Sequence, residues 1–436
     1  MKRVRHCGLL LFASFLILLI AFACHSSSSS SSSSGADDDS SPADDDASPA
    51  DDDDDATADC RAYADDAPAP SGSCAGNPNS IFPPPTGPYC IGTTVPIHLV
   101  DPSRGEPFTP NDPQARREMM VQVWYPIDQN AAGERAPYMD AKTAAYEAGV
   151  IPATWVHMPA SAFLALQSHA ILNAPPAAGK KKFPILLFSP GLKREYQIYT
   201  TMIENVVSHG FIVVSINHPY ISGAVVFPDG REVNVSLPAD EEGSLDLVVG
   251  DAHFTLDNVA KWNVDASGAQ PLACRFDLDK AAMYGHSYGG TTAVGLALVD
   301  SRIRAALNMD GPALGKAPAD GLGQPLFIML SDEHETDPNL PVEWAQQRGP
   351  GFAADIHGTA HMSYSDYPAI LHNFAPNTPL STLDMGTIAP DRAFEIIDRY
   401  VPGFFGVYLQ GQSLADFLAI AANYSEVTFQ SKNVGQ

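Results

Sequence analysis

Basic residues are scarce in this chain. Its 436 residues include 25 Lys and Arg against 51 Asp and Glu, which gives a formal net charge of -26 at pH 7. This charge argues against a nucleic-acid partner, because phosphates would be repelled at every approach. Hydrophobic residues still make up 45% of the chain, a composition that favours one large folded domain with accessory segments.

Long apolar runs are also scarce. The run near the start, Leu9 to Phe22, is shorter than the roughly 20 residues that a membrane-spanning helix needs. A basic stretch, residues 2–5, precedes it, and residues 21–23, directly before Cys24, supply the small residues of a cleavage site. Residues 1–24 therefore have the organisation of an export signal.

The segment that ends at Cys24 resembles the lipobox of bacterial lipoproteins, in which the cysteine that becomes the new N-terminus is acylated. We therefore expect lipid attachment at Cys24 and a lipid-anchored protein of the bacterial cell envelope. Ala21 stands where the lipobox usually has leucine, so free secretion is the alternative. His25 is not the aspartate that retains lipoproteins at the inner membrane, which allows the outer membrane or the cell surface as the destination.

Residues 25–79 form a segment of biased composition. Nine serines end at Ser34, and ADDDSSP, ADDDASP and ADDDDDA follow as three seven-residue units over residues 36–56. Such a stretch has few side chains to bury and repels itself, so we expect a disordered, extended tether. Calcium binding is the alternative, but the D-x-D-x-D-G pattern of an EF-hand loop is absent.

Cysteine is scarce, with six residues in the chain. None has the C-x-x-C spacing typical of zinc sites, so we expect no metal site. Once the export signal is removed and Cys24 is acylated, four cysteines remain in a compartment where disulfides form. Their spacing does not choose among the three pairings, and our working prediction joins Cys60 to Cys74 and Cys90 to Cys274.

From residue 80 to residue 436, short apolar runs alternate with longer stretches of helical spacing. This alternation predicts an α/β domain in which helices cover a mainly parallel sheet. The predicted strands are Met119–Tyr125, Phe183–Ser189, Phe211–Asn217, Ala281–Gly285, Ala305–Met309 and Leu326–Leu330. The predicted helices are Tyr196–Ser208, Leu256–Trp262, Gly290–Val299 and Asp391–Tyr400.

Residues 138–176 lie between the first two predicted strands. Their apolar positions recur at helical spacing, which predicts a helix packed on the core. A lipid-facing helix in an inserted cap is the alternative.

The pentapeptide Gly285-His286-Ser287-Tyr288-Gly289 fits the G-x-S-x-G elbow of hydrolases. The apolar run KAAMY precedes it and GGTTAVGLALV follows with helical spacing, so the strand and the helix that an elbow requires are both predicted. Glycine suits positions 285 and 289, because a side chain there would crowd the turn. We predict Ser287 as a nucleophile.

A serine nucleophile needs a base that takes its proton and an acid that orients the base. In α/β-hydrolases the acid and then the histidine follow the serine in the chain. Asp310 ends the apolar run RAALNM, where a strand would open into a loop, and is the predicted acid. Asp332, in MLSDEH after the next strand, is the competing candidate.

The predicted base is His361. In ADIHGTAHMSYSD a turn at residues 358–360 delivers this histidine beyond a short strand pattern. The other downstream histidines are His334, His357 and His372, of which His357 suits the end of a strand.

Acyl transfer also requires two backbone N–H groups for the oxyanion. Tyr288 supplies one by its position directly after the serine. We predict the second at Leu192, in the turn SPGL at residues 189–192 after a predicted strand.

Several blocks, taken in order, resemble the platelet-activating factor acetylhydrolase family of α/β-hydrolases. They are LFSPGLKREYQIYT, KAAMYGHSYGGTTA, ALNMDGPALG, PLFIMLSDEH and IHGTAHMSYSD. Upstream, TGPYCIGTTVPIHLVDPSR and REMMVQVWYP resemble the start of that family's catalytic domain. The likeness covers about residues 86–411 and implies the α/β-hydrolase fold and ester hydrolysis without a cofactor.

The resemblance also implies roles for single residues. It favours Asp310, the aspartate of NMDG, over Asp332 as the acid. The chain differs from the mammalian plasma enzymes of the family at Pro190, where they have histidine. The implied site consists of the nucleophile Ser287, the acid Asp310, the base His361 and the oxyanion donors Leu192 and Tyr288.

These features predict an exported serine esterase that cleaves short-chain carboxylic esters, with the sn-2 acetyl or short-acyl group of a phospholipid as a specific candidate. The alternative is a secreted esterase acting on a polyester or an acetylated polysaccharide. A third hypothesis is a surface binding module on a hydrolase scaffold. The oligomeric state is not addressed by the sequence.

Overall fold

The computed structural model describes residues 68–151, 156–179, 182–236, 244–265, 272–333, 337–383 and 385–435. They all fall within one compact unit, Asp55–Gln436. The predicted export signal, Cys24 and the tether up to residue 67 lie outside them. The part of the chain that the structure describes contains no helix long and apolar enough to cross a bilayer.

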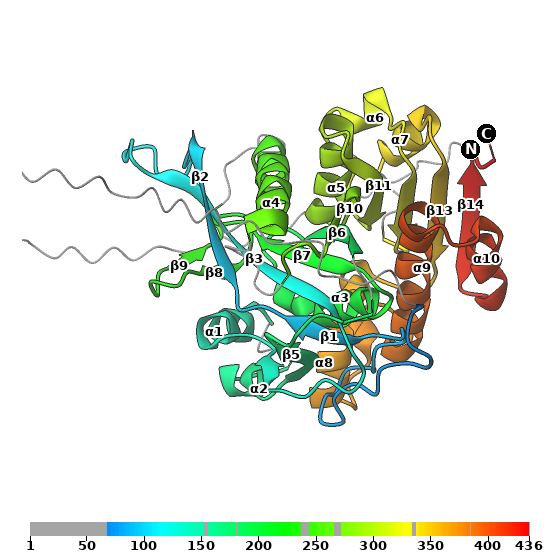
Figure 1. Ribbon diagram of the computed structural model, residues 1–436. Coiled ribbons are helices and arrows are strands. Elements are labelled where there is room, and N and C mark those ends of the chain that lie inside the picture. The colour runs from blue at the N-terminus through cyan, green and yellow to red at the C-terminus, as the bar shows by residue number, and fades with distance from the viewer. Residues whose placement is uncertain are drawn as a thin grey trace, which may run out of the picture. The chain divides into compact units, whose positions relative to one another are not determined.

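A sheet runs through the centre of this unit (Figure 1). Its strands are β1 (Cys90–Thr93), β2 (Ile97–Gly105), β3 (Arg116–Ile127), β4 (Arg135–Pro137), β5 (Gln167–Leu172), β6 (Phe183–Ser189), β7 (Ile212–Asn217), β10 (Phe276–His286), β11 (Ile303–Met309), β12 (Leu326–Leu330), β13 (Gly351–Ile356) and β14 (Val427–Lys432). Their order is β14-β13-β12-β11-β10-β6-β7-β3-β1-β5-β4, with β2 paired to β3. The strands from β13 to β7 are parallel, whereas β14 and β3 flank them in the antiparallel sense. The prediction of a mainly parallel sheet is therefore confirmed.

Helices cover both faces of the sheet. They are α1 (Ala141–Val150), α2 (Ala160–Leu164), α3 (Thr200–Ser208), α4 (Leu245–Asp265), α5 (Tyr288–Val299), α6 (Ala317–Asp320), α7 (Leu340–Gln346), α8 (Tyr367–Phe374), α9 (Pro390–Gln410) and α10 (Leu414–Leu418). In Figure 1, α4 and α5 lie on the opposite side of the sheet from α3 and α8. A short hairpin, β8 (Ala224–Val226) with β9 (Glu232–Asn234), forms a separate sheet.

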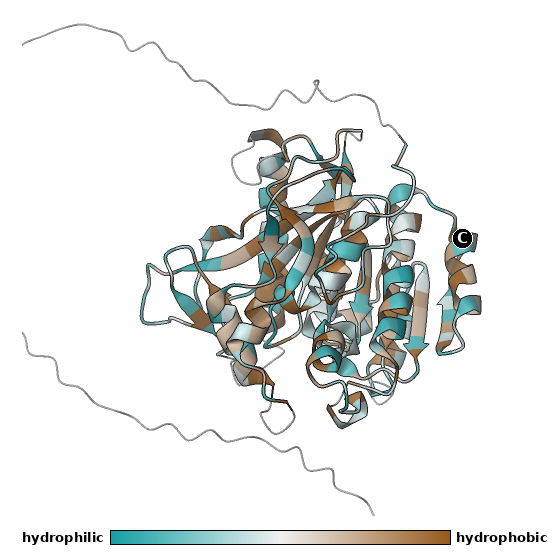
Figure 2. Ribbon diagram, turned by 90° about the horizontal axis from the view of Figure 1, so that it is seen from below, coloured by the Kyte–Doolittle hydropathy of each residue, from teal (hydrophilic) through white to brown (hydrophobic). Residues whose placement is uncertain are grey.

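Strand β6 shows why the central strands read as continuous apolar runs. All its residues are buried. Leu186 and Phe188 belong to the core that packs under α3 and α9, and Ile185 and Leu187 belong to the core under α4 and α5. Alternate side chains therefore enter two cores, and neither face needs polar residues. Figure 2 shows hydrophobic residues gathered on the central strands.

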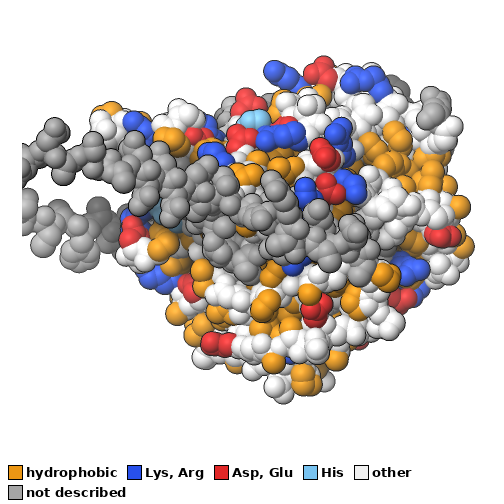
Figure 3. All heavy atoms as spheres, in the orientation of Figure 1, with side chains coloured by type: hydrophobic (Ala, Val, Ile, Leu, Met, Phe, Trp, Pro, Cys, Tyr) orange, Lys and Arg blue, Asp and Glu red, His pale blue; other side chains and the backbone are white. Residues whose placement is uncertain are grey.

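The net charge is distributed unevenly along the chain. Residues 25–67 contain 14 Asp and one Arg, so this segment carries half of the formal net charge. On the face shown in Figure 3, acidic and basic side chains of the folded unit are interspersed.

Each predicted strand and helix overlaps an element of the same kind, but the prediction for residues 138–176 was wrong in part. This segment contains α1 and α2, and it also contains strand β5, which pairs with β1 and β4. The N–H groups of His169 and Ala170 in β5 both donate to Glu204 Oε1 at 2.8 Å. These partners are distant in sequence, so local spacing of apolar residues does not reveal the strand.

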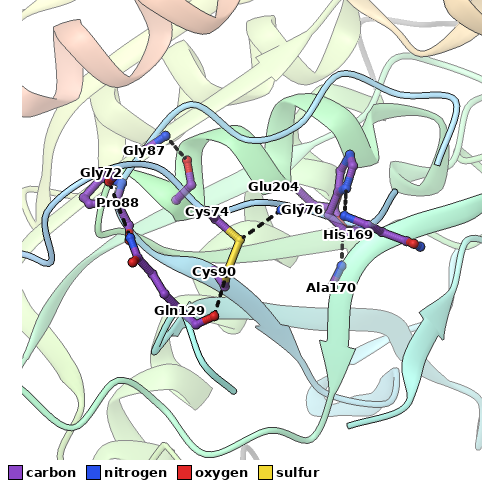
Figure 4. Close-up of a disulfide and its surroundings, with 12 residues drawn as sticks. Gly72, Cys74, Gly76, Gly87, Pro88, Cys90, Gln129, His169, Ala170 and Glu204 are labelled. Atoms are coloured by element: carbon purple, nitrogen blue, oxygen red, sulfur yellow. Dashed lines mark hydrogen bonds between the residues drawn. A yellow bond between two sulfur atoms is a disulfide. The ribbon is translucent and has the colours of Figure 1, made fainter. Parts of the chain in front are cut away.

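The predicted disulfide pairing was wrong. Cys74 and Cys90 form a disulfide whose Cα atoms lie 5.0 Å apart (Figure 4). Cys74 N–H donates to Gly87 O at 3.1 Å, so the chain folds back and brings Cys74 beside the start of β1. Cys274 is also disulfide-bonded, and its partner lies outside the described residues. Both predicted pairs are thereby excluded.

Candidate active site

Ser287 occupies the sharp turn between β10 and α5. Its φ of 55° and ψ of -125° lie in a region that costs a non-glycine residue about 1–3 kcal/mol. The N–H of Ser287 donates to Met309 O at 2.8 Å, and its C=O accepts from Gly290 N at 2.9 Å. These bonds hold the strained turn, which places Ser287 at the carboxyl end of the parallel strands.

The two glycines of the elbow are required by close backbone contacts. A Cβ atom at Gly285 would lie 2.4 Å from the carbonyl carbon of Gly289, and one at Gly289 would lie 2.0 Å from Ser189 O. Real Cβ atoms do not approach so closely. The turn can therefore pack against β6 only with glycine at both positions.

Ser287, His361 and Asp310 lie in one series of hydrogen bonds. His361 Nε2 is 2.9 Å from Ser287 Oγ, and His361 Nδ1 is 2.7 Å from Asp310 Oδ2. A carboxylate only accepts, so Nδ1 carries the proton and Nε2 accepts from the serine hydroxyl. His361 begins the short helix η5 (His361–Tyr364) and is 32% exposed at its side chain, whereas Asp310 is fully buried. The His361 side chain is therefore open to solvent, and the Asp310 carboxylate is not.

Asp310 directly follows β11, at a φ of 56°. Its N–H donates to Met329 O at 2.7 Å. Ser331, just after β12, donates to the carboxylate twice, from N to Oδ1 at 2.7 Å and from Oγ to Oδ2 at 2.9 Å. Sequence reasoning missed Ser331, although its place at the end of the next parallel strand was a usable signal. Two donors thus fix the carboxylate that faces His361.

The competing candidates for the acid and the base are not part of this series of hydrogen bonds, as far as the structure describes them. Asp332 accepts from Gly358 N at 2.7 Å and pairs with His357 at 3.2 Å, and both side chains of this pair are about half exposed. His372 is exposed near the end of α8. His334 lies outside the described residues.

No role was predicted for His286, the residue directly before Ser287. Its Nε2 lies 2.8 Å from His361 O and its Nδ1 lies 2.9 Å from Tyr199 OH. A carbonyl can only accept, so Nε2 carries the proton and Nδ1 accepts from the tyrosine. Burial, and then the nearby His361, lower the pKa of His286 well below its usual value. A neutral His286 therefore holds the backbone of His361 by donating from Nε2 to its carbonyl oxygen.

Atoms of His286, Asp310 and His361 also come within 4.8 Å of one another, which is a spacing that a metal-ligand set can have. Both ring nitrogens of each histidine already have hydrogen-bond partners. The arrangement is therefore accounted for by hydrogen bonding.

The predicted oxyanion donors flank Ser287. Tyr288 is the first residue of α5, where backbone N–H groups point out of the helix end. Leu192 lies in the turn after β6, and a Cβ atom at its neighbour Gly191 would be 3.2 Å from Ser287 Cβ. The side chains of Leu192 and Tyr288 share a small apolar cluster with Ile221. The turn, the elbow and an apolar surface thus meet beside the serine hydroxyl.

Comparison with known proteins bears on the fold and the family. A solved structure described as a ferulic acid esterase from Streptomyces cinnamoneus superposes with a TM-score of 0.69 at 27% identity, covering 81% of this chain and 99% of that one. Together with the strand order, this match confirms the predicted α/β-hydrolase fold.

Curated relatives match by sequence. An Arthroderma benhamiae protein named "Probable 1-alkyl-2-acetylglycerophosphocholine esterase" is 28% identical over 273 residues, 56% of this chain and 66% of that protein. The platelet-activating factor acetylhydrolase of Canis lupus familiaris is 26% identical over 233 residues, 45% of this chain and 50% of that protein. The chain thus spans less than two thirds of the length of these relatives.

The family model described as "Platelet-activating factor acetylhydrolase, isoform II" matches residues 74–232 and 255–412, which is more than half of the chain. The matched ranges include the elbow, the predicted acid and base and the turn after β6. The chain therefore belongs to the platelet-activating factor acetylhydrolase family.

Proposed function

We propose that the chain is a carboxylic ester hydrolase that uses Ser287 as nucleophile, His361 as general base and acid, and Asp310 as the group that orients the histidine. The observation that carries this proposal is the hydrogen-bonded series from Asp310 Oδ2 through His361 to Ser287 Oγ, with distances of 2.7 and 2.9 Å. The strained elbow and the two glycine contacts support it, because such a turn is maintained at a cost in stability.

In the proposed reaction, Ser287 Oγ attacks the ester carbonyl carbon while its proton passes to His361 Nε2. The carbonyl oxygen becomes an oxyanion that accepts from the N–H groups of Leu192 and Tyr288. The C–O bond to the alcohol then breaks, and the alcohol leaves with the proton from His361. Water then attacks the acyl carbon while its proton passes to His361 Nε2. The bond from that carbon to Ser287 Oγ breaks, Ser287 takes the proton from His361, and the carboxylic acid is released.

For the substrate we propose a short-chain acyl ester, with the sn-2 acetyl or short-acyl group of a phospholipid as the specific candidate. Family membership and the names of the curated relatives support this choice. The second candidate is an ester of an aromatic acid or a polymer, favoured by the structural match to a ferulic acid esterase. Rates on acetylated phospholipid vesicles, p-nitrophenyl acyl esters of increasing length and methyl ferulate would separate the two.

The test of the catalytic proposal compares the full wild-type chain with its Ser287→Ala variant. We expect the wild type to hydrolyse p-nitrophenyl acetate and to be labelled by a fluorophosphonate at Ser287, and the variant to lose both. Equal rates, together with no labelling of folded wild type, would favour the binding-module hypothesis instead.

For localisation we propose export with acylation of Cys24, as the sequence motif predicts. Metabolic labelling with an alkyne fatty acid in a bacterial host should mark the wild type and not a Cys24→Ala variant. Unlabelled protein released into the medium would support free secretion.

A further inference from the structure

A second series of aspartate, histidine and serine lies beneath the turn that carries Leu192. Asp251 on α4 is 2.9 Å from His218 Nδ1, and His218 Nε2 is 3.1 Å from Ser189 Oγ. The three residues are exposed by only 0%, 2% and 1%. Their order of donors and acceptors matches that of Asp310, His361 and Ser287, but burial keeps them from any substrate. A role for this series must therefore pass through the groups that it touches.

Ionisation states set the direction of its hydrogen bonds. Burial alone would raise the pKa of Asp251, but the Arg117 guanidinium and His218 lower it below the usual range. Arg117 binds this carboxylate with Nε at 3.0 Å and Nη2 at 2.7 Å. An ionised Asp251 only accepts, so His218 Nδ1 carries the proton and Nε2 accepts from the Ser189 hydroxyl. The Arg117 charge thus fixes the tautomer that holds Ser189.

His218 reaches both ends of the turn. Ser189 directly precedes Pro190, Gly191 and Leu192. On the far side, Lys193 N–H donates to Ile221 O at 2.9 Å, and Ile221 N–H donates to His218 O at 3.0 Å. The side chain of His218 therefore secures the start of the turn, and its carbonyl secures the end.

The same turn lies against the elbow. Ser189 O is the atom that a Cβ at Gly289 would approach to 2.0 Å, so a displacement of Ser189 would change the packing next to Ser287. An oxyanion donor is effective only when it lies at hydrogen-bond distance from the developing charge, and an error of about 1 Å in such a group can lower a rate about 100-fold.

We propose that His218, held by Asp251 and acting through Ser189, is a positioning residue that fixes the Leu192 N–H relative to Ser287. The inference rests on the proposed esterase function. A Ser189→Ala substitution removes the hydroxyl donor, leaves Nε2 of a buried histidine without a partner and loosens the first end of the turn.

The test measures kcat, KM and the inhibition constant of a trifluoromethyl ketone for Ser189→Ala. This inhibitor forms a tetrahedral oxyanion on the serine, so it reports on the oxyanion donors. Titration with a fluorophosphonate gives the concentration of reactive Ser287, and kcat is expressed per titrated site so that misfolded protein does not count.

Ser215→Ala provides a matched control. Ser215 lies on the neighbouring strand β7, opposite Phe188 of β6, and is fully buried. Its hydroxyl also takes part in buried hydrogen bonds, which go to β3 and not to the turn: it accepts from Trp124 Nε1 at 3.0 Å and donates to Gln122 O at 3.2 Å. The two variants should lose comparable stability.

We expect Ser189→Ala to lower kcat roughly 10- to 100-fold and to weaken the ketone by the same factor, with KM within about twofold of the wild type. Ser215→Ala should keep the wild-type kcat and ketone affinity. The proposal is overturned if Ser189→Ala keeps them too, or if both variants lose them equally. An inactive, unlabelled wild type would instead refute the esterase function.

Discussion

Replacement of Asp310 by asparagine tests the predicted acid without changing its size. The carboxylate accepts from Ser331 N, from Ser331 Oγ and from His361 Nδ1 at 2.7–2.9 Å. In the variant, the amide oxygen can keep the Ser331 N–H, and the amide NH2 then faces His361 Nδ1. His361 must respond by carrying its proton on Nε2, where it can no longer accept from Ser287.

A wrong tautomer of this kind costs about 10⁴ in kcat, which is roughly 5.4 kcal/mol of transition-state stabilisation. The assay is the initial rate of p-nitrophenyl acetate hydrolysis per titrated protein, with a melting temperature to show that the fold persists. Asp332→Asn is the matched control, because Asp332 pairs with His357 and is about half exposed; it should keep the wild-type rate. A variant at position 310 that retained more than a tenth of the wild-type rate would refute the assignment of the acid.

Three further predictions concern the fold. Gly289→Ala should give no soluble protein that a fluorophosphonate labels, because its Cβ would lie 2.0 Å from Ser189 O. The control Gly149→Ala, in α1, has nothing within 4 Å of its Cβ and should be tolerated. Equal yields of soluble, labelled protein from the two variants would contradict this prediction. Cys74→Ser opens a loop whose ends are 16 residues apart and should lower the free energy of unfolding by about 3 kcal/mol. Urea unfolding measures this loss, and an unchanged urea midpoint would argue against it. Burial raises the pKa of Glu204 to about 8 in the folded state. The folded protein therefore binds a proton that the unfolded chain releases above its ordinary pKa near 4.3. Stability should fall as the pH rises from about 4.5 to 8, and Glu204→Gln should flatten that fall in melting temperature; identical profiles would exclude Glu204 as its source.

Much of this molecule is readable from local patterns. The elbow pentapeptide, the apolar runs of β6, β10 and β11 and the helical spacing after Ser287 are short-range features, because a strand or a turn is specified by neighbouring residues. They sufficed for the α/β fold, and the ordered blocks sufficed for the family. The export signal and the acidic tether are likewise matters of composition, and they remain predictions.

Tertiary structure decided what depends on contacts between distant segments. The Cys74–Cys90 bond follows from a fold-back at Gly87, and β5 follows from its pairing with β1 and β4. The buried series from Asp251 through His218 to Ser189 joins α4, the end of β7 and the end of β6. No local pattern marks these contacts, because each joins segments that are distant in the sequence and meet only when the chain folds. The sequence by itself therefore determined the position of the serine elbow, and the fold determined which buried groups surround Ser287, because those groups meet only in the folded chain.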